Sequence, residues 1–544
     1  MTQSHVYVVM GDITHLECDA WMLPSDSEYN VASHWTGVSD LSAAVQRSHQ
    51  PGYSSGQELA IPLTGWASKQ PLPILTAVPL RGFTDADALR PRINAFIRVG
   101  AAAANQRRAA GDGPVAARPN LLLAMPSFAS DGGGGRLRKG DILETILKQA
   151  RETAADVGVD VVLVLKDEKL FALAQMKRRA SEYWSELLDR DLLDHAKSLS
   201  SLAKAGRLVP FMGAGTSVSA GAPSWADLIG ALAEDADLAA DERTALLDSN
   251  MDARDQASYL RERFESAEGP RAHATFNDAV SGQVNLDRYG LAPALLAGLR
   301  TEQAITLNYD CLFELASEDI GDARTVIPDS RVNGDRWLLK LHGSVKDPAS
   351  IVLTRDDYLG FNASRDALSA VVKATLITHH LLFVGFGLRD DHFHEIIHDV
   401  RRAVPPIQGE TKALATALTL MASPLNNMLW EKKLKLISMG AKDGSKQEIR
   451  RAARILEIFL DALLAFSTDS HSYLLADEYL DALTPAEKRL RGSLLAFCDD
   501  RTAEERDSAA WPVIAETLTR LGLPSQTRTS VHKMTVSLYA RKGT

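Results

Sequence analysis

Short apolar runs that alternate with helical patterns occupy the first 175 residues. Val6–Met10, residues 121–125 and Asp160–Leu165 are rich in valine and leucine, as buried strands are. Between the last two runs, the apolar residues of segment 141–147 recur at the spacing of a helix. Strands that alternate with helices predict a sheet flanked by helices.

A second alternating pattern begins at Leu208. Its apolar runs predict buried strands at Leu208–Met212 and at residues 304–307, 337–341, 381–384 and 434–437. An amphipathic helix follows, and its apolar face carries Ile449, Ala452, Leu456, Leu460 and Leu463.

The segment between the two patterns, residues 176–206, is charged and has a helical period. It predicts a helical connector whose inner face carries Tyr183, Trp184, Leu187 and Leu188. From about Ser467 onward the chain predicts mostly helix. The predicted fold class is therefore α/β, with two α/β domains and a helical carboxy-terminal tail.

Length and charge narrow the classes of ligand. The 544 residues exceed the roughly 250–300 that one hydrophobic core supports. The 60 Lys and Arg residues are outnumbered by 70 Asp and Glu residues, so the net charge is −10. This balance argues against a broadly basic nucleic-acid surface. An anionic ligand must then be held by local backbone amides and helix ends.

The three cysteines, Cys18, Cys311 and Cys498, lie far apart and form no C-x-x-C pair. We therefore expect neither a cysteine zinc site nor a disulfide framework, and no metal site is predicted. No apolar run approaches the roughly 20 residues that span a bilayer, and no signal peptide begins the chain. We expect a cytoplasmic protein that does not enter a membrane.

A glycine-rich turn after the strand at 208–212 is the sharpest motif. It consists of Gly213, Ala214, Gly215, Thr216 and Ser217. Glycines at this place let the backbone approach a diphosphate, and the next helix offers free amides. The spacing is not G-x-G-x-x-G, so a plain tight turn is the alternative. Pro223 and Trp225 follow a few residues later.

Three further clusters follow predicted strands. They contain Asn308 and Asp310, then His342, then Gly385, Phe386, Gly387 and Asp390. The carboxyl ends of parallel strands form the ligand crevice of doubly wound sheets, so all four clusters are expected in one cleft. Taken singly, Asn308 could cap a helix, His342 could be a turn histidine, and the glycines could form a bare loop.

The ordered set GAGTS, PSW, LNYD, KLHGS and VGFGLRD resembles the sirtuin fold in its bacterial sirtuin-like NAD-hydrolase branch, over residues 200–465. The resemblance implies a Rossmann-type parallel sheet with helical insertions. It also implies that residues 213–217, Pro223 and Trp225 surround NAD, and that Asn308 and His342 lie at the nicotinamide ribose. Residues 385–390 would then meet the adenosine half.

The chemistry of such a site can be argued from the residues. Cleavage between nicotinamide and the ribose C1′ passes through an oxocarbenium-like state, and nicotinamide leaves as a neutral group. Asn308 can orient a water without adding charge, and His342 can accept a proton near neutral pH. Asp310 either holds the Asn308 loop or stabilises the cation. Sirtuin deacylases carry a zinc module with two C-x-x-C pairs, and its absence here favours water as the acceptor.

The first residues resemble the opening of a macro domain. Asp12 and Ile13 belong to a G-D-I-T turn, and Gly132, Gly133, Gly134 and Gly135 resemble the diphosphate loop of that family. A flexible linker is the alternative for the glycines. Pro24, Ser25 and Asp26 stand where binding macro domains carry asparagines, so the match is imperfect. The residues used for de-ADP-ribosylation are not evident, so binding of an ADP-ribose-type signal nucleotide is expected rather than a second enzyme activity.

These patterns divide the chain into four parts. They are a macro-like nucleotide-sensing domain (1–178), a helical connector (179–206), a sirtuin-like NAD-hydrolase domain (207–466) and a helical carboxy-terminal region (467–544). We expect a homo-oligomeric NAD hydrolase of antiviral defence, with a partner protein of the defence system as a further expectation. The alternatives are a zinc-free protein deacylase or ADP-ribosyltransferase, and a non-catalytic scaffold that binds NAD or ADP-ribose.

Overall fold

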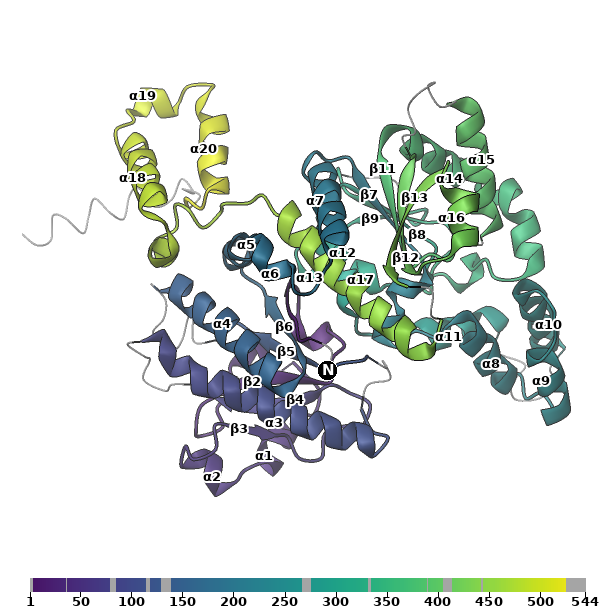
Figure 1. Ribbon diagram of the computed structural model, residues 1–544, viewed down its shortest axis with the longest axis horizontal. Coiled ribbons are helices and arrows are strands. Elements are labelled where there is room, and N and C mark those ends of the chain that lie inside the picture. The colour runs from purple at the N-terminus through teal and green to yellow at the C-terminus, as the bar shows by residue number, and fades with distance from the viewer. Residues whose placement is uncertain are drawn as a thin grey trace, which may run out of the picture.

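A six-stranded sheet forms the amino-terminal part of the computed structural model (Figure 1). The structure describes residues 3–35, 37–78, 85–113, 118–128, 138–266, 275–330, 334–388, 390–404, 413–441 and 444–524. The sheet has the order β1-β6-β5-β2-β4-β3, and every pairing is parallel except that of β3 with β4. Its strands are β1 (Val6–Met10), β2 (Ala20–Ser25), β3 (Ala60–Pro62), β4 (Leu72–Ala77), β5 (Leu122–Pro126) and β6 (Asp160–Leu165).

Helices cover this first sheet. Helices α3 and α4 pack against each other and against the strands, while α5 packs on β1 and β6. The helices of this part are α1 (Leu41–Arg47), α2 (Pro51–Ser54), α3 (Arg90–Ala109), α4 (Lys139–Val157) and α5 (Glu168–Lys177). The predicted connector contains α6 (Ser181–Trp184) and α7 (Arg190–Lys204), and Trp184 and Leu188 of its predicted inner face are buried.

The second sheet has seven strands, all parallel, in the order β13-β12-β11-β7-β8-β10-β9. They are β7 (Leu208–Met212), β8 (Gln303–Thr306), β9 (Thr325–Ile327), β10 (Trp337–Lys340), β11 (His380–Val384), β12 (Ala415–Met421) and β13 (Leu434–Gly440). The predicted strands are confirmed to within a few residues, but β2, β3, β4, β9 and β12 were not predicted as apolar runs.

Alternate residues of the second sheet enter two different cores. Val209 and Phe211 of β7 join the core beneath α14 (Arg355–Thr378) and α15 (Asp391–Ala403). Leu208 and Met212 of the same strand face the opposite core, which is continuous with that of the first sheet. Helices therefore cover both faces of the parallel sheet, as the α/β prediction requires.

The remaining helices form an insertion, a set that packs near the second sheet, and the tail. The insertion between β7 and β8 has its own small core and contains α8 (Trp225–Asp235), α9 (Ala240–Leu247), α10 (Ala253–Glu265) and α11 (Phe276–Val284). The second set is α12 (Leu291–Gly298), α13 (Leu312–Asp319), α16 (Pro424–Trp430) and α17 (Lys446–Ser467). The predicted helical tail is confirmed as α18 (Pro485–Asp499), α19 (Ala503–Arg506) and α20 (Trp511–Arg520). Within the described residues, no helix is long and apolar enough to cross a bilayer.

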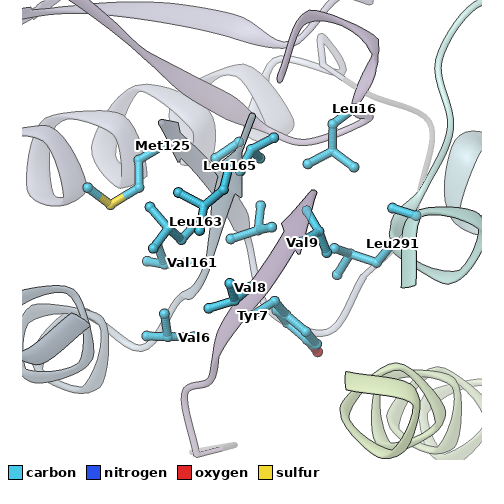
Figure 2. Close-up of a cluster of buried hydrophobic side chains, with 14 of the residues drawn as sticks. Val6, Tyr7, Val8, Val9, Leu16, Met125, Val161, Leu163, Leu165 and Leu291 are labelled. Atoms are coloured by element: carbon cyan, nitrogen blue, oxygen red, sulfur yellow. The ribbon is translucent and has the colours of Figure 1, made fainter. Parts of the chain in front are cut away.

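Strand β1 and helix α17 join the two sheets. Strand β1 is the edge of the first sheet, and both α12 and α17 contact it. Figure 2 shows Leu291 of α12 beside Val9 of β1. Helix α17 also packs on α7, β12 and β13, and it runs between the two sheets in Figure 1. One continuous hydrophobic core therefore extends from the first sheet to one face of the second.

Candidate functional site

The four predicted clusters lie at the ends of four adjacent strands. In the second sheet, Val384 of β11 pairs with Met212 of β7, and Thr306 of β8 pairs with both Met212 and Lys340. Asn308 lies two residues after Thr306, and His342 lies two residues after Lys340. The two residues therefore follow neighbouring strands, which are about 4.8 Å apart in a sheet.

The glycine loops after β7 and β11 pack directly on each other. Gly213 N donates to Val384 O at 3.0 Å, and Gly215 N donates to Gly385 O at 2.9 Å. A Cβ on Gly213 would lie 2.6 Å from Gly385 O, and a Cβ on Gly385 would lie 2.7 Å from the carbonyl carbon of Gly215. Gly385 also has a φ of +65°, so both loops require glycine for this approach.

A hydrogen-bond relay orients the side chain of Asn308. Its Nδ2 donates to Thr216 Oγ1 at 3.2 Å and to Ser217 Oγ at 3.1 Å. Ser217 in turn donates to Asp310 Oδ2 at 2.7 Å, which leaves Ser217 Oγ as the acceptor toward Asn308. The relay directs the nitrogen of the amide inward, and Asn308 Oδ1 remains buried without a hydrogen-bond partner. Asn308 does not cap α13.

His342 is enclosed beside Asp390. The residue is 4% exposed, and its Nε2 is buried without a hydrogen-bond partner, 3.8 Å from Asp390 Oδ2. Burial lowers the pKa of His342 to about 4, although the Asp390 carboxylate opposes this shift. The imidazole is therefore neutral at pH 7. A neutral ring with a free nitrogen can accept a proton from a group that enters the site.

A buried lysine supports the loop that carries Asn308. Lys340, the last residue of β10, donates through Nζ to Tyr309 O at 3.3 Å and to Glu314 Oε1 at 2.7 Å, and it also bonds Asp310 O. Asp310 itself accepts from Leu312 N at 3.1 Å, and burial raises the pKa of its carboxyl. These bonds tie residues 309 and 310 to the end of β10.

A cavity of about 440 Å³ opens behind the glycine loops. Four of the predicted cofactor-binding residues line it: Gly215, Gly385, Phe386 and Gly387. The opposite wall contains the end of β12, Arg454 of α17, and Arg118 of the amino-terminal part. Its size suits one half of a dinucleotide, because ligand pockets of this kind measure a few hundred Å³.

The other predicted residues take different places. Ala214, Thr216 and Ser217 form the turn after β7, and Thr216 and Ser217 are buried. Pro223 is half-buried before α8, and Trp225 begins that helix with its indole Nε1 buried and without a partner. The resemblance associated Asp390 with the adenosine half, whereas the structure brings its carboxylate next to His342.

In the amino-terminal part, Asp12 and Ile13 form a turn after β1 that docks on the second sheet's part of the chain. Asp12 Oδ1 accepts from Thr14, and Asp12 Oδ2 pairs with Lys166 Nζ at 2.6 Å. Asp12 N donates to the hydroxyl of Tyr289 at 3.1 Å, and that hydroxyl donates to Asp319 at 2.8 Å. Ile13 is buried. Gly132, Gly133, Gly134 and Gly135 lie outside the described residues.

A carboxylate from the distant carboxy-terminal region occupies the start of α4. Asp481 accepts from Gly140 N at 3.3 Å and from Asp141 N at 2.7 Å. Close by, the hydroxyl of Tyr479 donates to Asp167 at 2.7 Å. The amides with which α4 would hold a phosphate therefore already have an anionic partner in this structure.

Sequence reasoning missed several side chains near the site. Lys340 had a signal, because a lysine that ends an apolar run needs a buried partner. His392 also had a signal, since it lies two residues after the predicted Asp390. Tyr358 and Arg118 had none, since each comes to the site from a separate segment.

Comparisons with known proteins find a family match within the second sheet. Residues 302–436 match the family model described as a SIR2-like domain, which begins just before β8 and ends within β13. This stretch contains Asn308, His342 and the loop after β11.

Curated relatives extend the similarity. The NAD(+) hydrolase ThsA of Bacillus cereus is 30% identical over 199 residues, which are 36% of this chain and 40% of that protein. ThsA of Enterococcus faecium is 28% identical over 218 residues, 38% of this chain and 42% of that protein. Defense-associated sirtuin 2 of Bacillus subtilis is 27% identical over 227 residues, 40% of this chain and 21% of that protein. The chain thus spans about two fifths of the length of these ThsA proteins.

Proposed function

We propose that this protein hydrolyses NAD to nicotinamide and ADP-ribose. The observation that carries the proposal is a pair of buried polar atoms just after the neighbouring strands β8 and β10, Asn308 Oδ1 and His342 Nε2, neither of which has a hydrogen-bond partner. Buried polar atoms are nearly always satisfied, so two unpartnered atoms at the ends of adjacent strands indicate a place for the hydroxyls of a ligand or a water.

The reaction follows from these two acceptors. As the bond between nicotinamide and the ribose C1′ breaks, positive charge develops on the sugar. Asn308 Oδ1 accepts a hydrogen bond from the attacking water and so aims the water oxygen at C1′. His342, neutral because burial lowers its pKa to about 4, takes a proton from a ribose hydroxyl or from that water. The glycine loops and the 440 Å³ cavity receive the rest of the dinucleotide.

Asp310 acts as a positioning residue in this proposal. Its carboxylate holds Ser217, which holds the amide of Asn308. The backbone of Asp310 is in turn tied to Lys340. Relatives support the proposal because two proteins named NAD(+) hydrolase are similar to 36–38% of this chain.

The amino-terminal domain is proposed to bind an ADP-ribose-type nucleotide through Asp12, Ile13 and Gly132 to Gly135. Binding would start NAD cleavage and serve antiviral defence, as the name of Defense-associated sirtuin 2 suggests for a relative. A homo-oligomer, a defence-system partner and a cytoplasmic location complete the proposal. The contacts of Asp12 with Tyr289 and of Asp481 with α4 would have to change for such a ligand to reach both sites.

The test follows nicotinamide release from NAD, with and without cyclic ADP-ribose-type nucleotides. We expect Asn308→Ala and His342→Ala each to lower kcat/KM by about 100-fold or more, the usual contribution of a positioned acid–base group. His398→Ala, which changes an exposed histidine of α15, is the matched control and should keep full turnover.

Full turnover in both site variants would refute the assignment of the site. NAD consumption that requires an acyl-lysine peptide or an acceptor protein would instead favour a deacylase or transferase. Tight binding of NAD without nicotinamide release, with every nucleotide tried, would favour a scaffold.

A further inference from the structure

Three potential metal ligands surround His342. One ligand atom each from His342, Asp390 and His392 lies within 4.8 Å of the other two. His342 follows β10, Asp390 caps the start of α15, and His392 is the second residue of that helix. The two histidines are only 4% and 8% exposed, so this is an enclosed cluster rather than a group of surface side chains.

The hydrogen bond of His392 leaves one of its ring nitrogens free for a ligand. Nε2 lies 3.1 Å from the backbone oxygen of Tyr358, which can only accept, so Nε2 carries the proton. Nδ1 then has a lone pair, and it is buried without a hydrogen-bond partner. The ring is held between Phe361 and Tyr358, with centroid separations of 3.7 and 4.7 Å. Metal-binding histidines commonly donate their second N–H to a backbone oxygen in this way.

Asp390 is fixed in a similar manner. Oδ1 accepts from Phe393 N at 3.0 Å, and Oδ2 accepts from the hydroxyl of Tyr358 at 3.0 Å. Oδ2 is also 3.8 Å from His342 Nε2, which has no hydrogen-bond partner of its own. The cluster therefore contains one buried imidazole lone pair on His392 Nδ1, one unpartnered ring nitrogen of His342 and one oriented carboxylate.

We propose that His342, Asp390 and His392 bind a divalent first-row transition-metal ion of the Zn²⁺ class. Two imidazoles and a carboxylate are a preferred ligand set for such ions, and three protein ligands leave one position open. Bonds of about 2.0–2.2 Å put the ligand atoms of a tetrahedral ion roughly 3.4 Å apart. Small side-chain rotations bring the observed 3.8 Å to that value.

Metal binding at this place would switch off NAD cleavage. The ion takes the lone pair of His342 Nε2, which is the proton acceptor in the proposed function, so the ion and catalysis exclude each other. This consequence rests on the proposed function, whereas the metal site itself does not. The cluster is separate from any cysteine zinc module, because Cys18, Cys311 and Cys498 are all free thiols outside it.

Titration of the full chain with Co²⁺ and Zn²⁺ tests the site directly. Co²⁺ should give the visible absorption bands of a four-coordinate ion, and Zn²⁺ should displace it with a stoichiometry of one per chain. His392→Phe keeps a ring between Phe361 and Tyr358 but removes a ligand, and it should weaken Zn²⁺ binding by about ten-fold or more. His394→Phe, two residues farther along α15 and exposed, is the matched control and should bind as the wild type does.

Activity provides the second measurement. Added Zn²⁺ should inhibit nicotinamide release by the wild type, EDTA should restore it, and His392→Phe should need at least ten-fold more Zn²⁺. Equal Zn²⁺ affinity of the wild type and His392→Phe, or absence of the Co²⁺ bands in the wild type, would overturn the metal site. If His392→Phe does not fold, His392→Gln replaces it in the same titration. Absence of NAD cleavage with an intact Co²⁺ spectrum would refute the proposed function alone.

Discussion

Ser217 holds the amide of Asn308 in one orientation. The serine hydroxyl donates to Asp310 and accepts from Asn308, so the direction of both bonds is determined. Asn308 Oδ1 is then the atom of the amide that stays buried without a hydrogen-bond partner. The side chain that accepts the water is thus aligned by a residue more than 90 positions away in the chain.

Replacement of this serine tests its positioning role. Ser217→Ala should lower kcat by about 10- to 100-fold, because an amide free to rotate no longer aims the water. Binding of ADP-ribose, measured calorimetrically, should change little, since the cavity-lining loops stay in place. Ser201→Ala removes an exposed hydroxyl of α7, outside the site, and it should keep kcat. A loss of affinity with unchanged kcat in Ser217→Ala would contradict the positioning role.

Residue types at this site were largely predictable, whereas the bonds among them were not. GAGTS, LNYD and KLHGS each follow a buried strand, and parallel strands end at one edge, so proximity followed from topology. The hydrogen-bond relay from Asp310 to Asn308 could not be predicted from the sequence, because an asparagine amide can point either way. Arg118 reaches the region from a segment whose own sequence contains no sign of it, whereas His392 follows the predicted Asp390 by two residues and was not recognised.

At the scale of elements, the loops after β7 and β11 behave as one unit. Gly213 N donates to Val384 O and Gly215 N donates to Gly385 O, and none of these three glycines leaves room for a side chain. A change in the backbone of one loop therefore requires a change in the backbone of the other.

A pair of substitutions in one loop examines this fit. Gly385→Ala should lower the free energy of unfolding by about 2–4 kcal/mol, because alanine disfavours a positive φ and its Cβ meets the backbone of Gly215. Gly387→Ala, at a position with no atom within 4 Å of the added Cβ, should stay within about 0.5 kcal/mol of wild type. Denaturant melts of both variants provide the comparison, and equal midpoints would count against the interlocked loops.

Helix α17 carries buried charges on one face, which its apolar pattern did not predict. Arg454 bonds both carboxylate oxygens of Asp160 at 2.7 Å, and Glu457 pairs with Arg118 at 2.6 Å. Asp461 pairs with Arg178 and accepts from His5 Nε2 at 2.7 Å. The periodicity of leucine and isoleucine predicted the helix, but the partners of its charges lie in the first 178 residues. Strand β12, which lies next to the edge strand β13, was missed because its sequence, ATALTLM, mixes threonine and alanine with few large apolar residues.

Removal of one of these charges should be costly. Asp461→Ala leaves Arg178 buried without its carboxylate, and breaking a buried pair costs about 3–5 kcal/mol. On the exposed side of the same helix, Arg451→Ala breaks an i,i+3 pair with Glu448 and should cost about 0.5 kcal/mol or less. Urea unfolding followed by circular dichroism measures both, and similar midpoints for the two variants would exclude a structural role for the buried pair.

At the scale of the whole molecule, the two sheets meet where the chain leaves β1. Glu17 N donates to Tyr289 O at 2.9 Å, and Leu16 pairs with Tyr289 across the junction. Burial raises the pKa of Glu17 to about 7, although nearby Arg288 opposes this. The junction therefore contains a carboxyl group that titrates near neutral pH.

This carboxyl makes stability depend on pH. Between its ordinary pKa of 4.5 and about 7, folded Glu17 holds a proton that the unfolded chain has lost, so stability falls as pH rises through this range. The full penalty is about 3 kcal/mol, from a shift of 4.5 to about 7. Glu17→Gln should thus be more stable than wild type at pH 8 and nearly equal to it at pH 5 in thermal melts. Glu28→Gln, at an exposed site of the same part, is the control, and a pH-independent gap for Glu17→Gln would refute the assignment.

The docking of Asp481 on α4 makes the carboxy-terminal region a tethered competitor. A carboxylate on the same chain is present at a high effective concentration, so any anion that seeks the amides of Gly140 and Asp141 must first displace it. The apparent affinity of such an anion is its intrinsic affinity multiplied by the fraction of molecules in which the carboxy-terminal segment is not docked. Binding of an anion at α4 and release of the carboxy-terminal segment are therefore linked, because each bound anion displaces one segment from α4.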